Sequence, residues 1–460
     1  MLERKAMGQI EKWHRGDARK ALLIKGARQI GKTTVVRQFA RTHYKNFVEL
    51  NFLEDVRAHA IFDDSLDADS LVAALTSYVR KPLDPGNTLI LFDEVQECPR
   101  ARMAVKFLVE DGRFDYIETG SLLGVKSRQV GSYPVGFEEH LQMYPLDFEE
   151  FCLANGVQPQ ALNSLRECFE KRVAVNPAVH GAMMKLFFAY MVVGGMPEVV
   201  QRYVDTHDVA QAMALQKGLL DLYRLDIAKY AENGDAAKAR SVFDAIPAQL
   251  DDKNRRFVLA DIDKNARQNR YASSFLWLVD AGVALPCYNV QQPVAPLEAN
   301  CKHSLFKLFM GDTGLLCAAT LGNIQFDLLQ GNTDVNVGSI TENVVAQELK
   351  SNGFNLNYFN NKRYGEVDFI VQDGAKVIPV EVKSGNDWRA HKALHNVLSV
   401  EQWHMDEAFV LCKGNVECDG SIVYLPLYMT MFLRPTPAPE SLVYQVDLSA
   451  LDELTRERIN

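Results

Sequence analysis

The sequence lacks the paired cysteines of a zinc or redox site. None of its eight cysteines has a partner at CxxC spacing, so we expect reduced thiols, as in an intracellular protein. It also has no uncharged apolar run long enough to span a membrane, and its first residues lack the apolar segment of a secretory signal. These absences predict a cytoplasmic protein with no membrane partner.

An excess of positive charge is also missing. The chain has 50 Lys and Arg against 59 Asp and Glu, a formal charge of −9. Avid nucleic-acid binding usually requires a basic surface, so the whole-chain charge does not favour it, although a local basic patch remains compatible. With 47% hydrophobic and 24% charged residues, the 460-residue chain has a globular composition. This length predicts roughly two to four domains.

Short apolar segments alternate with helical patterns from residue 21 to about 125. We expect a helix at Lys32–His43 and strands at 21–26, 46–52, 88–94 and 116–121. Continuous apolar runs bounded by turns are typical of a parallel sheet that is buried on both faces. The first 150 residues are therefore predicted to form a doubly wound α/β domain.

Residues 26–33 match the phosphate-loop pattern GxxxxGK[ST] at every fixed position. Glycine lets such a loop turn sharply and direct backbone N–H groups toward phosphates. Lys32 would place a positive charge on the β- and γ-phosphates, and Thr33 would offer a hydroxyl to Mg²⁺. We predict that ATP is bound by the whole loop: Gly26, Ala27, Arg28, Gln29, Ile30, Gly31, Lys32, Thr33 and Thr34.

Two acids, Asp93 and Glu94, end the apolar segment 88–94. Alone, such a pair is more often a solvated turn, but about 60 residues after a phosphate loop it favours a Walker B site. Asp93 would hold Mg²⁺ and Glu94 would orient or deprotonate the attacking water. Ser121, after the last predicted strand, either contacts the γ-phosphate or the water, or caps a helix.

The guanine-reading motif NKxD does not occur between the phosphate loop and residue 150. ATP is therefore favoured over GTP, and a guanine-nucleotide switch remains a weaker alternative. Arg113 and Arg128 are candidates for an arginine finger, although surface arginines usually have no such role.

The segment after residue 150 is largely helical to about residue 234, and the pattern then changes. Helices at Ala236–Gln249, near Ile262–Asn269 and at Tyr271–Ala281 precede two candidate strands, 283–290 and 305–310. This order predicts a winged-helix-like region over residues 235–312.

Four residues after position 335 form a second candidate site. Glu342 lies in a predicted helix over 339–353, Asp368 in an apolar run, and Glu381 and Lys383 alternate on one strand. Alternation places Glu381 and Lys383 on the same face. Carboxylates that hold a second Mg²⁺ or Mn²⁺ beside a lysine suit phosphodiester cleavage. A lone ExK pair on a strand is close to background, so a purely structural role stays open.

Motifs along nearly the whole chain carry a family resemblance. They are GARQIGKTT (26–34), LFDEVQ (91–96), ETGS (118–121), YPLDFEEF (144–151), GGMPEVV (194–200), KLFMGDTGLL (307–316), TENVVAQEL (341–349), GEVDFIV (365–371) and PVEVKSG (379–385). The chain resembles prokaryotic AAA-superfamily ATPases with a C-terminal domain of the restriction-endonuclease-like, PD-(D/E)xK fold. By position, Glu342, Asp368, Glu381 and Lys383 match the quartet of that fold, with Val367 in place of the proline.

The resemblance implies four parts. They are a P-loop ATPase core at 1–150, a helical lid at 151–234, the winged-helix-like region at 235–312 and a mixed α/β nuclease-like domain at 313–460.

Two functions follow from this organisation. The chain is either an ATPase coupled to a metal-dependent nuclease that acts on DNA or RNA, or an ATP-driven switch or signalling protein whose C-terminal domain binds without cleaving. A protein partner at the winged-helix-like region and oligomer formation fit both. Residues 340–395 contain seven Lys or Arg and seven Asp or Glu, and this neutrality argues against tight DNA binding.

Overall fold

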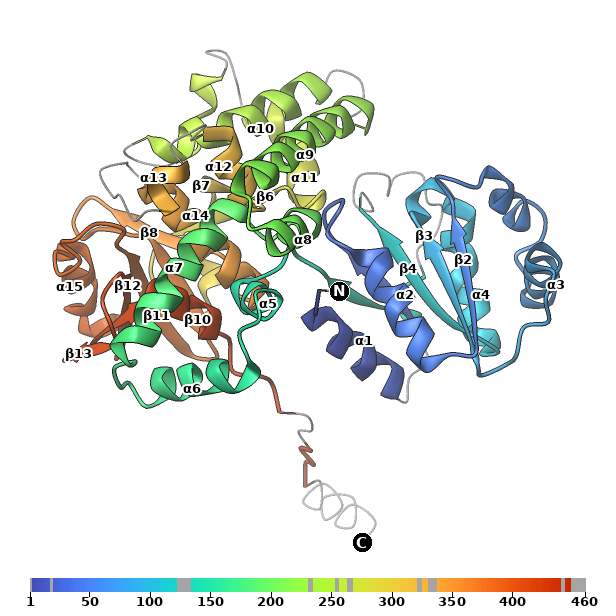
Figure 1. Ribbon diagram of the computed structural model, residues 1–460, viewed down its shortest axis with the longest axis horizontal. Helices are drawn as coiled ribbons and strands as arrows, with labels where there is room; N and C mark the ends of the chain where they lie inside the picture. The colour runs from blue at the N-terminus through green and yellow to red at the C-terminus, as the bar shows by residue number, and fades with distance from the viewer. Residues whose placement is uncertain are drawn as a thin grey trace, which may run out of the picture.

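A computed structural model describes residues 2–16, 20–121, 134–230, 235–252, 256–262, 268–320, 325–329, 337–439 and 443–447. An N-terminal α/β part lies beside a larger part that contains the other elements (Figure 1). All eight cysteines are among the described residues and are free thiols. None of the helices described is long and apolar enough to cross a membrane.

The N-terminal part is built on a five-stranded sheet in the order β2-β3-β4-β1-β5. Every neighbouring pair is parallel, which confirms the predicted parallel sheet. All six residues of β3 are buried, as expected for a strand covered on both faces. The strands are β1 (Ala21–Lys25), β2 (Asn46–Asn51), β3 (Thr88–Asp93), β4 (Asp115–Gly120) and β5 (Glu138–Gln142).

Helices accompany this sheet in the order expected of strand–helix repeats. The helix predicted after the first strand begins and ends at the expected residues, Lys32 and His43. The helices of this part are α1 (Lys5–Arg15), α2 (Lys32–His43), α3 (Ala68–Val79) and α4 (Pro99–Asp111).

The next stretch is helical, as its pattern predicts. Its helices are α5 (Phe148–Ala154), α6 (Pro159–Glu170), α7 (Pro177–Val193), α8 (Pro197–Thr206) and α9 (Val209–Tyr230). Three of them start with proline, whose fixed φ and missing N–H suit the first helical position. Helix α7 packs on α12, α13 and α14, and α9 on α10 and α12. These helices thus belong largely to the larger part (Figure 1).

The middle of the chain contains two described α-helices and a hairpin: α10 (Asp235–Asp251), α11 (Gln268–Asp280), β6 (Ala284–Val290) and β7 (Cys301–Met310). Strands β6 and β7 pair antiparallel, as two wing strands would. Most of the helix expected near Ile262–Asn269 lies outside the described residues. Strand β6 also pairs in parallel with β8 (Asn357–Asn361), so one sheet crosses the predicted domain boundary at 312/313.

The C-terminal elements form two sheets. A four-stranded sheet has the order β7-β6-β8-β9, and a mixed five-stranded sheet has the order β10-β11-β12-β14-β13. In the second sheet, β11, β12 and β14 are parallel and both outer pairs are antiparallel. Its strands are β10 (Phe369–Asp373), β11 (Lys376–Val382), β12 (Ala408–Cys412), β13 (Glu417–Asp419) and β14 (Ile422–Pro426). The remaining elements are β9 (Gly365–Val367), α12 (Thr313–Thr320), α13 (Gln325–Leu329), α14 (Gly338–Ser351) and α15 (Lys392–Leu398).

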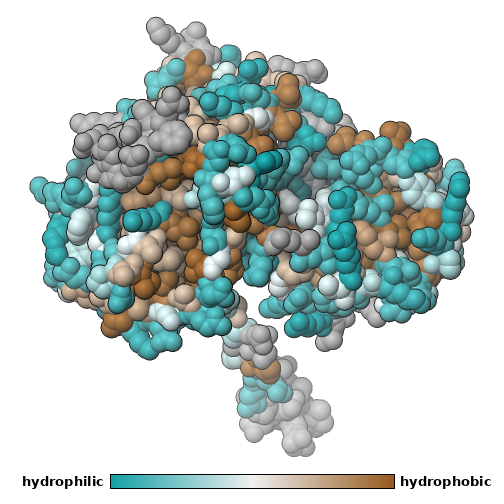
Figure 2. Space-filling view, in the orientation of Figure 1, coloured by the Kyte–Doolittle hydropathy of each residue, from teal (hydrophilic) through white to brown (hydrophobic). Residues whose placement is uncertain are grey.

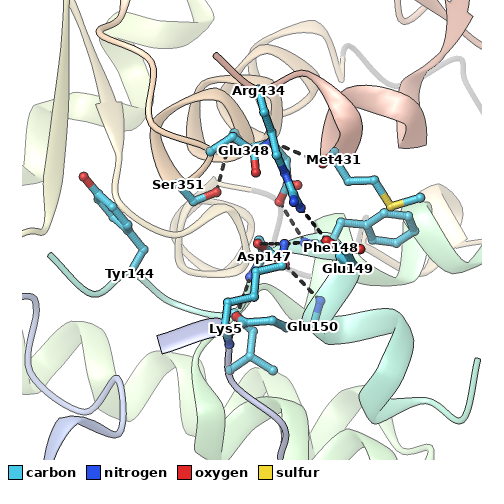
Figure 3. A network of polar contacts seen from close by, with 12 residues as sticks. Lys5, Tyr144, Asp147, Phe148, Glu149, Glu150, Glu348, Ser351, Met431 and Arg434 are labelled. Carbon is cyan, nitrogen blue, oxygen red and sulfur yellow. Dashed lines mark hydrogen bonds and ion pairs between the residues drawn. The ribbon is translucent and has the colours of Figure 1, made fainter. Parts of the chain in front are cut away.

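A polar network joins the start of α1 to α5 and α14 (Figure 3). The Lys5 ammonium forms an ion pair with Asp147, the N-cap of α5. Glu348 of α14 accepts hydrogen bonds of 2.9 Å each from the backbone N–H of Phe148 and from the hydroxyl of Tyr190. Burial raises the pKa of Glu348 to about 8, and the charge of Asp147 adds to this effect.

The surface of the molecule seen in Figure 2 is mostly hydrophilic, with apolar side chains showing in patches between the helices. The Glu348 side chain does not belong to this outer face, because it is fully buried.

Candidate functional site

The phosphate loop connects β1 to α2. Gly26 has a φ of +146°, and a Cβ there would lie 2.2 Å from the carbonyl oxygen of Met143 and 2.6 Å from Cδ1 of Ile30. Gly31, with a φ of +87°, adopts the left-handed conformation that starts α2. Only glycine fits the first position, and it is strongly favoured at the second.

Lys32 is folded back over the start of this loop. Its Nζ donates to the carbonyl oxygens of Gly26 and Ala27, at 2.9 and 2.7 Å, and the residue is only 7% exposed. Burial lowers the pKa of Lys32 to about 8, while the charges of Glu94 and Asp93 oppose that shift. The ammonium thus lies on the concave side of the loop, where a phosphate would need it.

Asp93 stands at the carboxyl end of β3 and is held from three sides. Thr33 donates its hydroxyl to Oδ1 at 2.9 Å, Thr119 donates to the same oxygen, and the Asn51 amide donates to Oδ2 at 3.1 Å. Burial raises the pKa of Asp93, although the two hydroxyl bonds oppose this effect. Because β2, β3 and β4 are parallel neighbours, Asn51, Asp93 and Thr119 meet at one edge of the sheet.

Glu94 follows Asp93 in a left-handed backbone conformation, with a φ of +53°. Non-glycine residues rarely adopt it, and such strain tends to collect at functional sites. The Glu94 carboxylate accepts hydrogen bonds from the Gln96 amide and, at 3.4 Å, from the Ser121 hydroxyl. The structure therefore brings Glu94 and Ser121 together, and their predicted roles around a lytic water stay predictions.

Residues from outside the motif also touch the phosphate loop. Arg28 forms an ion pair with Asp226 on α9. Gly282, which follows α11, approaches so closely that a Cβ there would lie 2.9 Å from the backbone nitrogen of Ala27. The loop is thus packed against elements of the larger part.

The candidate arginine fingers receive no support. Arg113 forms ion pairs with Asp111 and Asp69, each at 2.7 Å, within the N-terminal part. Arg128 lies outside the described residues.

The C-terminal carboxylates lie around the junction of the two sheets. Asp368 sits at a one-residue break between β9 and β10, inside the apolar run predicted to contain it. The register of β10 on β11 pairs Phe369 with Val380, which places Asp368 opposite Glu381. The Asp368 carboxylate accepts from the backbone N–H of Val382 at 2.9 Å.

Lysines neutralise these acids. Lys383 lies 2.9 Å from Glu381. Burial, together with the charge of Asp368, raises the pKa of Glu381 to about 8, although Lys383 opposes the shift. The fully buried Lys307 of β7 lies 2.8 Å from Glu366 and 3.7 Å from Glu342.

A metal group is not assembled from these acids. Throughout the described residues, which include Glu342, Asp368 and Glu381, no three His, Cys, Asp or Glu side chains are placed to hold one metal ion. The metal site predicted at Glu342, Asp368 and Glu381 is therefore not supported by this conformation and stays a prediction. Lys383 lies beside Glu381, as predicted for a site without metal, and Lys307 lies near Glu342.

A cavity of about 590 Å³ opens beside the phosphate loop. Gly26 and Ser121 line one end, and Lys350 and Tyr288 belong to its other walls. It lies where the AAA-like sheet, the β6–β7 hairpin and the end of α14 meet.

Several residues of the site were not predicted from the sequence. Asn51 and Thr119 had a usable signal, since each is a polar residue near the carboxyl end of a strand beside β3. Lys307 had a weaker signal, as a lone charge in an apolar strand. Asp226 had none, because its contact with Arg28 spans 198 positions.

Comparison with known families agrees with the geometry of the N-terminal site. Residues 18–152 match a family described as "AAA domain". The N-terminal part is thus similar to an AAA domain. This match supports an AAA-type P-loop ATPase. Two further families, both described as domains of unknown function (DUF8612 and DUF4143), match residues 184–325 and 337–429. None of the curated proteins matches the chain.

Several solved structures are distantly similar to the chain. A Walker-type ATPase of Pyrococcus abyssi, PABY2304, is 12% identical over 70% of this chain and 96% of its own, with a TM-score of 0.43. The Aeropyrum pernix ORC1 protein in complex with DNA is 14% identical over 71% and 94%, with a TM-score of 0.27. The Thermotoga maritima RuvB Holliday junction branch migration motor is 14% identical over 62% and 89%, with a TM-score of 0.28. Scores this low say nothing about what this chain binds.

Proposed function

We propose that this protein binds ATP with Mg²⁺ and hydrolyses it at the edge formed by the phosphate loop and Asp93. The observation that carries the proposal is the convergence on Asp93 of the Thr33, Thr119 and Asn51 side chains, beside the buried ammonium of Lys32. Hard oxygen ligands of this kind suit Mg²⁺. Glycine at position 26, where a Cβ would collide with the carbonyl oxygen of Met143, lets the loop take its tight path, and the helix N-terminus that follows suits a phosphate.

Each residue then has a role. The backbone N–H groups of residues 26–34 bind the phosphates, and Lys32 balances their charge. Thr33 and Asp93 hold Mg²⁺, which when bound neutralises charge on the transferring phosphoryl group. Glu94 orients the attacking water and accepts its proton, and Ser121 fixes the Glu94 carboxylate.

For the C-terminal residues 313–460 we propose a nuclease-like fold. The order α14, β10, β11, α15 and β12, with Glu381 and Lys383 on one strand, supports it. We also keep residues 151–234 as a helical lid and 235–312 as a winged-helix-like region, with α11 and the β6–β7 hairpin as support. The ATPase core at 1–150 completes this proposed division.

Of the two functions, the ATP-driven switch is the better supported. In the part of the chain that the structure describes, no three acids are placed to share one metal ion, and the buried Lys307 lies near Glu342 and Glu366. Lys383 stands beside Glu381, as a nuclease site would also require. A domain of this kind would bind nucleic acid or protein without cleaving it. The cytoplasmic location and oligomer formation stay predictions.

One assay separates these possibilities. ATP hydrolysis by the full chain is measured with Mg²⁺, alone and with plasmid, linear or branched DNA, while the DNA is followed on a gel. We expect Mg²⁺-dependent hydrolysis that is lost in Asp93→Asn, and intact DNA. Cleavage that disappears in Asp368→Ala and Lys383→Ala, while hydrolysis of ATP persists, would restore the nuclease. A wild-type protein without hydrolysis would refute the ATPase.

A further inference from the structure

Two carbonyl groups of the phosphate loop are held by side chains from distant parts of the chain. Tyr223 of α9 donates its hydroxyl to the carbonyl oxygen of Arg28 at 3.0 Å. Arg4, just before α1, donates from Nη1 to the carbonyl oxygen of Ile30 at 2.7 Å. Both donors are buried, with 5% of Tyr223 and 7% of the Arg4 side chain exposed.

These contacts fix the direction of two backbone N–H groups. Both peptide bonds concerned are trans, and in a trans peptide the C=O and the following N–H point in opposite directions. The carbonyl of Arg28 faces Tyr223, so the N–H of Gln29 points away from α9. In the same way, the carbonyl of Ile30 faces Arg4, and the N–H of Gly31 points away from the N-terminal segment.

The ammonium of Lys32 binds two other carbonyls of the loop, those of Gly26 and Ala27. Tyr223 and Arg4 reach the loop from α9 and from the segment before α1. A phosphate bound by the loop would meet the N–H groups of Gln29 and Gly31 on the side away from these two donors.

We propose that Tyr223 and Arg4 are positioning residues of the phosphate site, which orient the amides of Gln29 and Gly31 before the nucleotide binds. The proposal rests on the ATP binding proposed above. A loop whose donors already point at the ligand loses less free energy to ordering when it binds. Neither residue touches the nucleotide, so both act through the loop.

The surroundings of both side chains make them suitable for this role. The guanidinium of Arg4 also donates to the Tyr144 carbonyl at 2.6 Å and to the Glu150 carboxylate at 3.2 Å. These contacts prevent the guanidinium group from rotating freely. On α9, Asp226 follows Tyr223 by three residues and holds the Arg28 side chain. One helix face therefore fixes both the backbone and the side chain of Arg28.

The test uses two ligands that share only their phosphates. Dissociation constants for ATP and for inorganic tripolyphosphate are measured by calorimetry on the full chain and on Tyr223→Phe and Arg4→Lys. Tyr223→Phe removes one neutral hydrogen bond, and we expect about 3- to 10-fold weaker binding of both ligands. Arg4→Lys keeps the positive charge but removes the planar set of guanidinium donors. We expect the affinity for both ligands to fall about tenfold or more.

Tyr116→Phe is the matched control. The Tyr116 hydroxyl is buried in the same N-terminal part and has no hydrogen-bond partner among the described residues, so its removal should leave both affinities unchanged. The melting temperature without ligand, measured for each variant, separates a local effect on the loop from general destabilisation.

Equal losses for ATP and tripolyphosphate in Tyr223→Phe, with an unchanged melting temperature, are the expected result. Unchanged affinities in that variant would overturn the proposal, as would a loss for ATP that tripolyphosphate does not share. Should Arg4→Lys fail to fold, Tyr223→Phe decides alone. A wild-type chain that binds neither ligand would refute the proposed ATPase itself, and the two failures are thereby distinguished.

Discussion

The hydroxyl of Thr33 donates a 2.9 Å hydrogen bond to the carboxylate of Asp93, although the two residues stand 60 positions apart. The bond joins the first residues of α2 to the end of β3. It exists because β1 and β3 are held at fixed spacing by β4, which lies between them in the sheet. Thr33 and Asp93 would hold a metal ion with two oxygens that already lie close together, the hydroxyl keeping its proton and offering a lone pair.

Glu94→Gln should preserve binding of ATP and Mg²⁺ and slow hydrolysis. The carboxamide keeps the shape of the side chain and cannot accept the water's proton, and loss of a general base lowers the rate on the order of 10²–10⁴-fold. Steady-state turnover and the dissociation constant for ATP are measured on the same preparation.

Glu54→Gln, at an exposed position of the same domain, is the control for this variant and should turn over ATP normally. Normal hydrolysis by Glu94→Gln would mean that Glu94 only ends a strand and that the base lies elsewhere.

Nucleotide affinity should depend on pH through Lys32. Its pKa, lowered by burial to about 8, means that the free protein holds a charged ammonium below that pH and a neutral amine above it. A phosphate needs the ammonium, so the dissociation constant for ATP should rise about tenfold between roughly pH 7 and 9. Titrations across this range measure it.

Lys32→Arg provides the comparison, because a guanidinium stays charged throughout. Its affinity, even if weaker, should vary little with pH over the same range. A wild-type profile as flat as that of Lys32→Arg would contradict the assignment.

Stability should respond to pH through Glu348. Its pKa in the folded protein, about 8, exceeds that of an unfolded chain, so the folded state binds an extra proton between these values and loses stability as pH rises through them. Glu348→Gln cannot ionise, and its amide oxygen can still accept from Phe148 and Tyr190. Its stability relative to wild type should therefore improve by about 2–3 kcal/mol between roughly pH 6 and 8.5.

Denaturant unfolding of both proteins at the two pH values measures this difference. If the difference in unfolding free energy between Glu348→Gln and wild type does not change with pH, Glu348 is ionised in the folded protein under both conditions.

The phosphate loop could be predicted from the sequence because its conformation depends on residues that are consecutive in the chain. Gly26 is required by the carbonyl of Met143, and Gly31 by a left-handed turn, and both needs appear as glycine at fixed spacing. The opposition of Asp368 and Glu381 was also foreseeable, since it follows from strand pairing.

Other features depend on contacts that no local pattern encodes. Tyr223 meets Arg28 across 195 positions, and nothing about a tyrosine in a helix indicates such a bond. The parallel pairing of β6 with β8 likewise joins segments on both sides of the predicted boundary at 312/313. Lys307 enters the carboxylate cluster only because that sheet brings β7 close to it.

Lys32→Ala tests the central claim most directly. The variant removes the ammonium that lies against Gly26 and Ala27, a charged contact to phosphate worth roughly 1.5–3 kcal/mol, or about 10- to 100-fold in affinity. Lys106→Ala, on the exposed surface of α4, is the control. With folding verified by the melting temperature, ATP turnover should vanish in Lys32→Ala and persist in Lys106→Ala. Turnover by a folded Lys32→Ala protein at the wild-type rate would contradict an ATPase site at this loop.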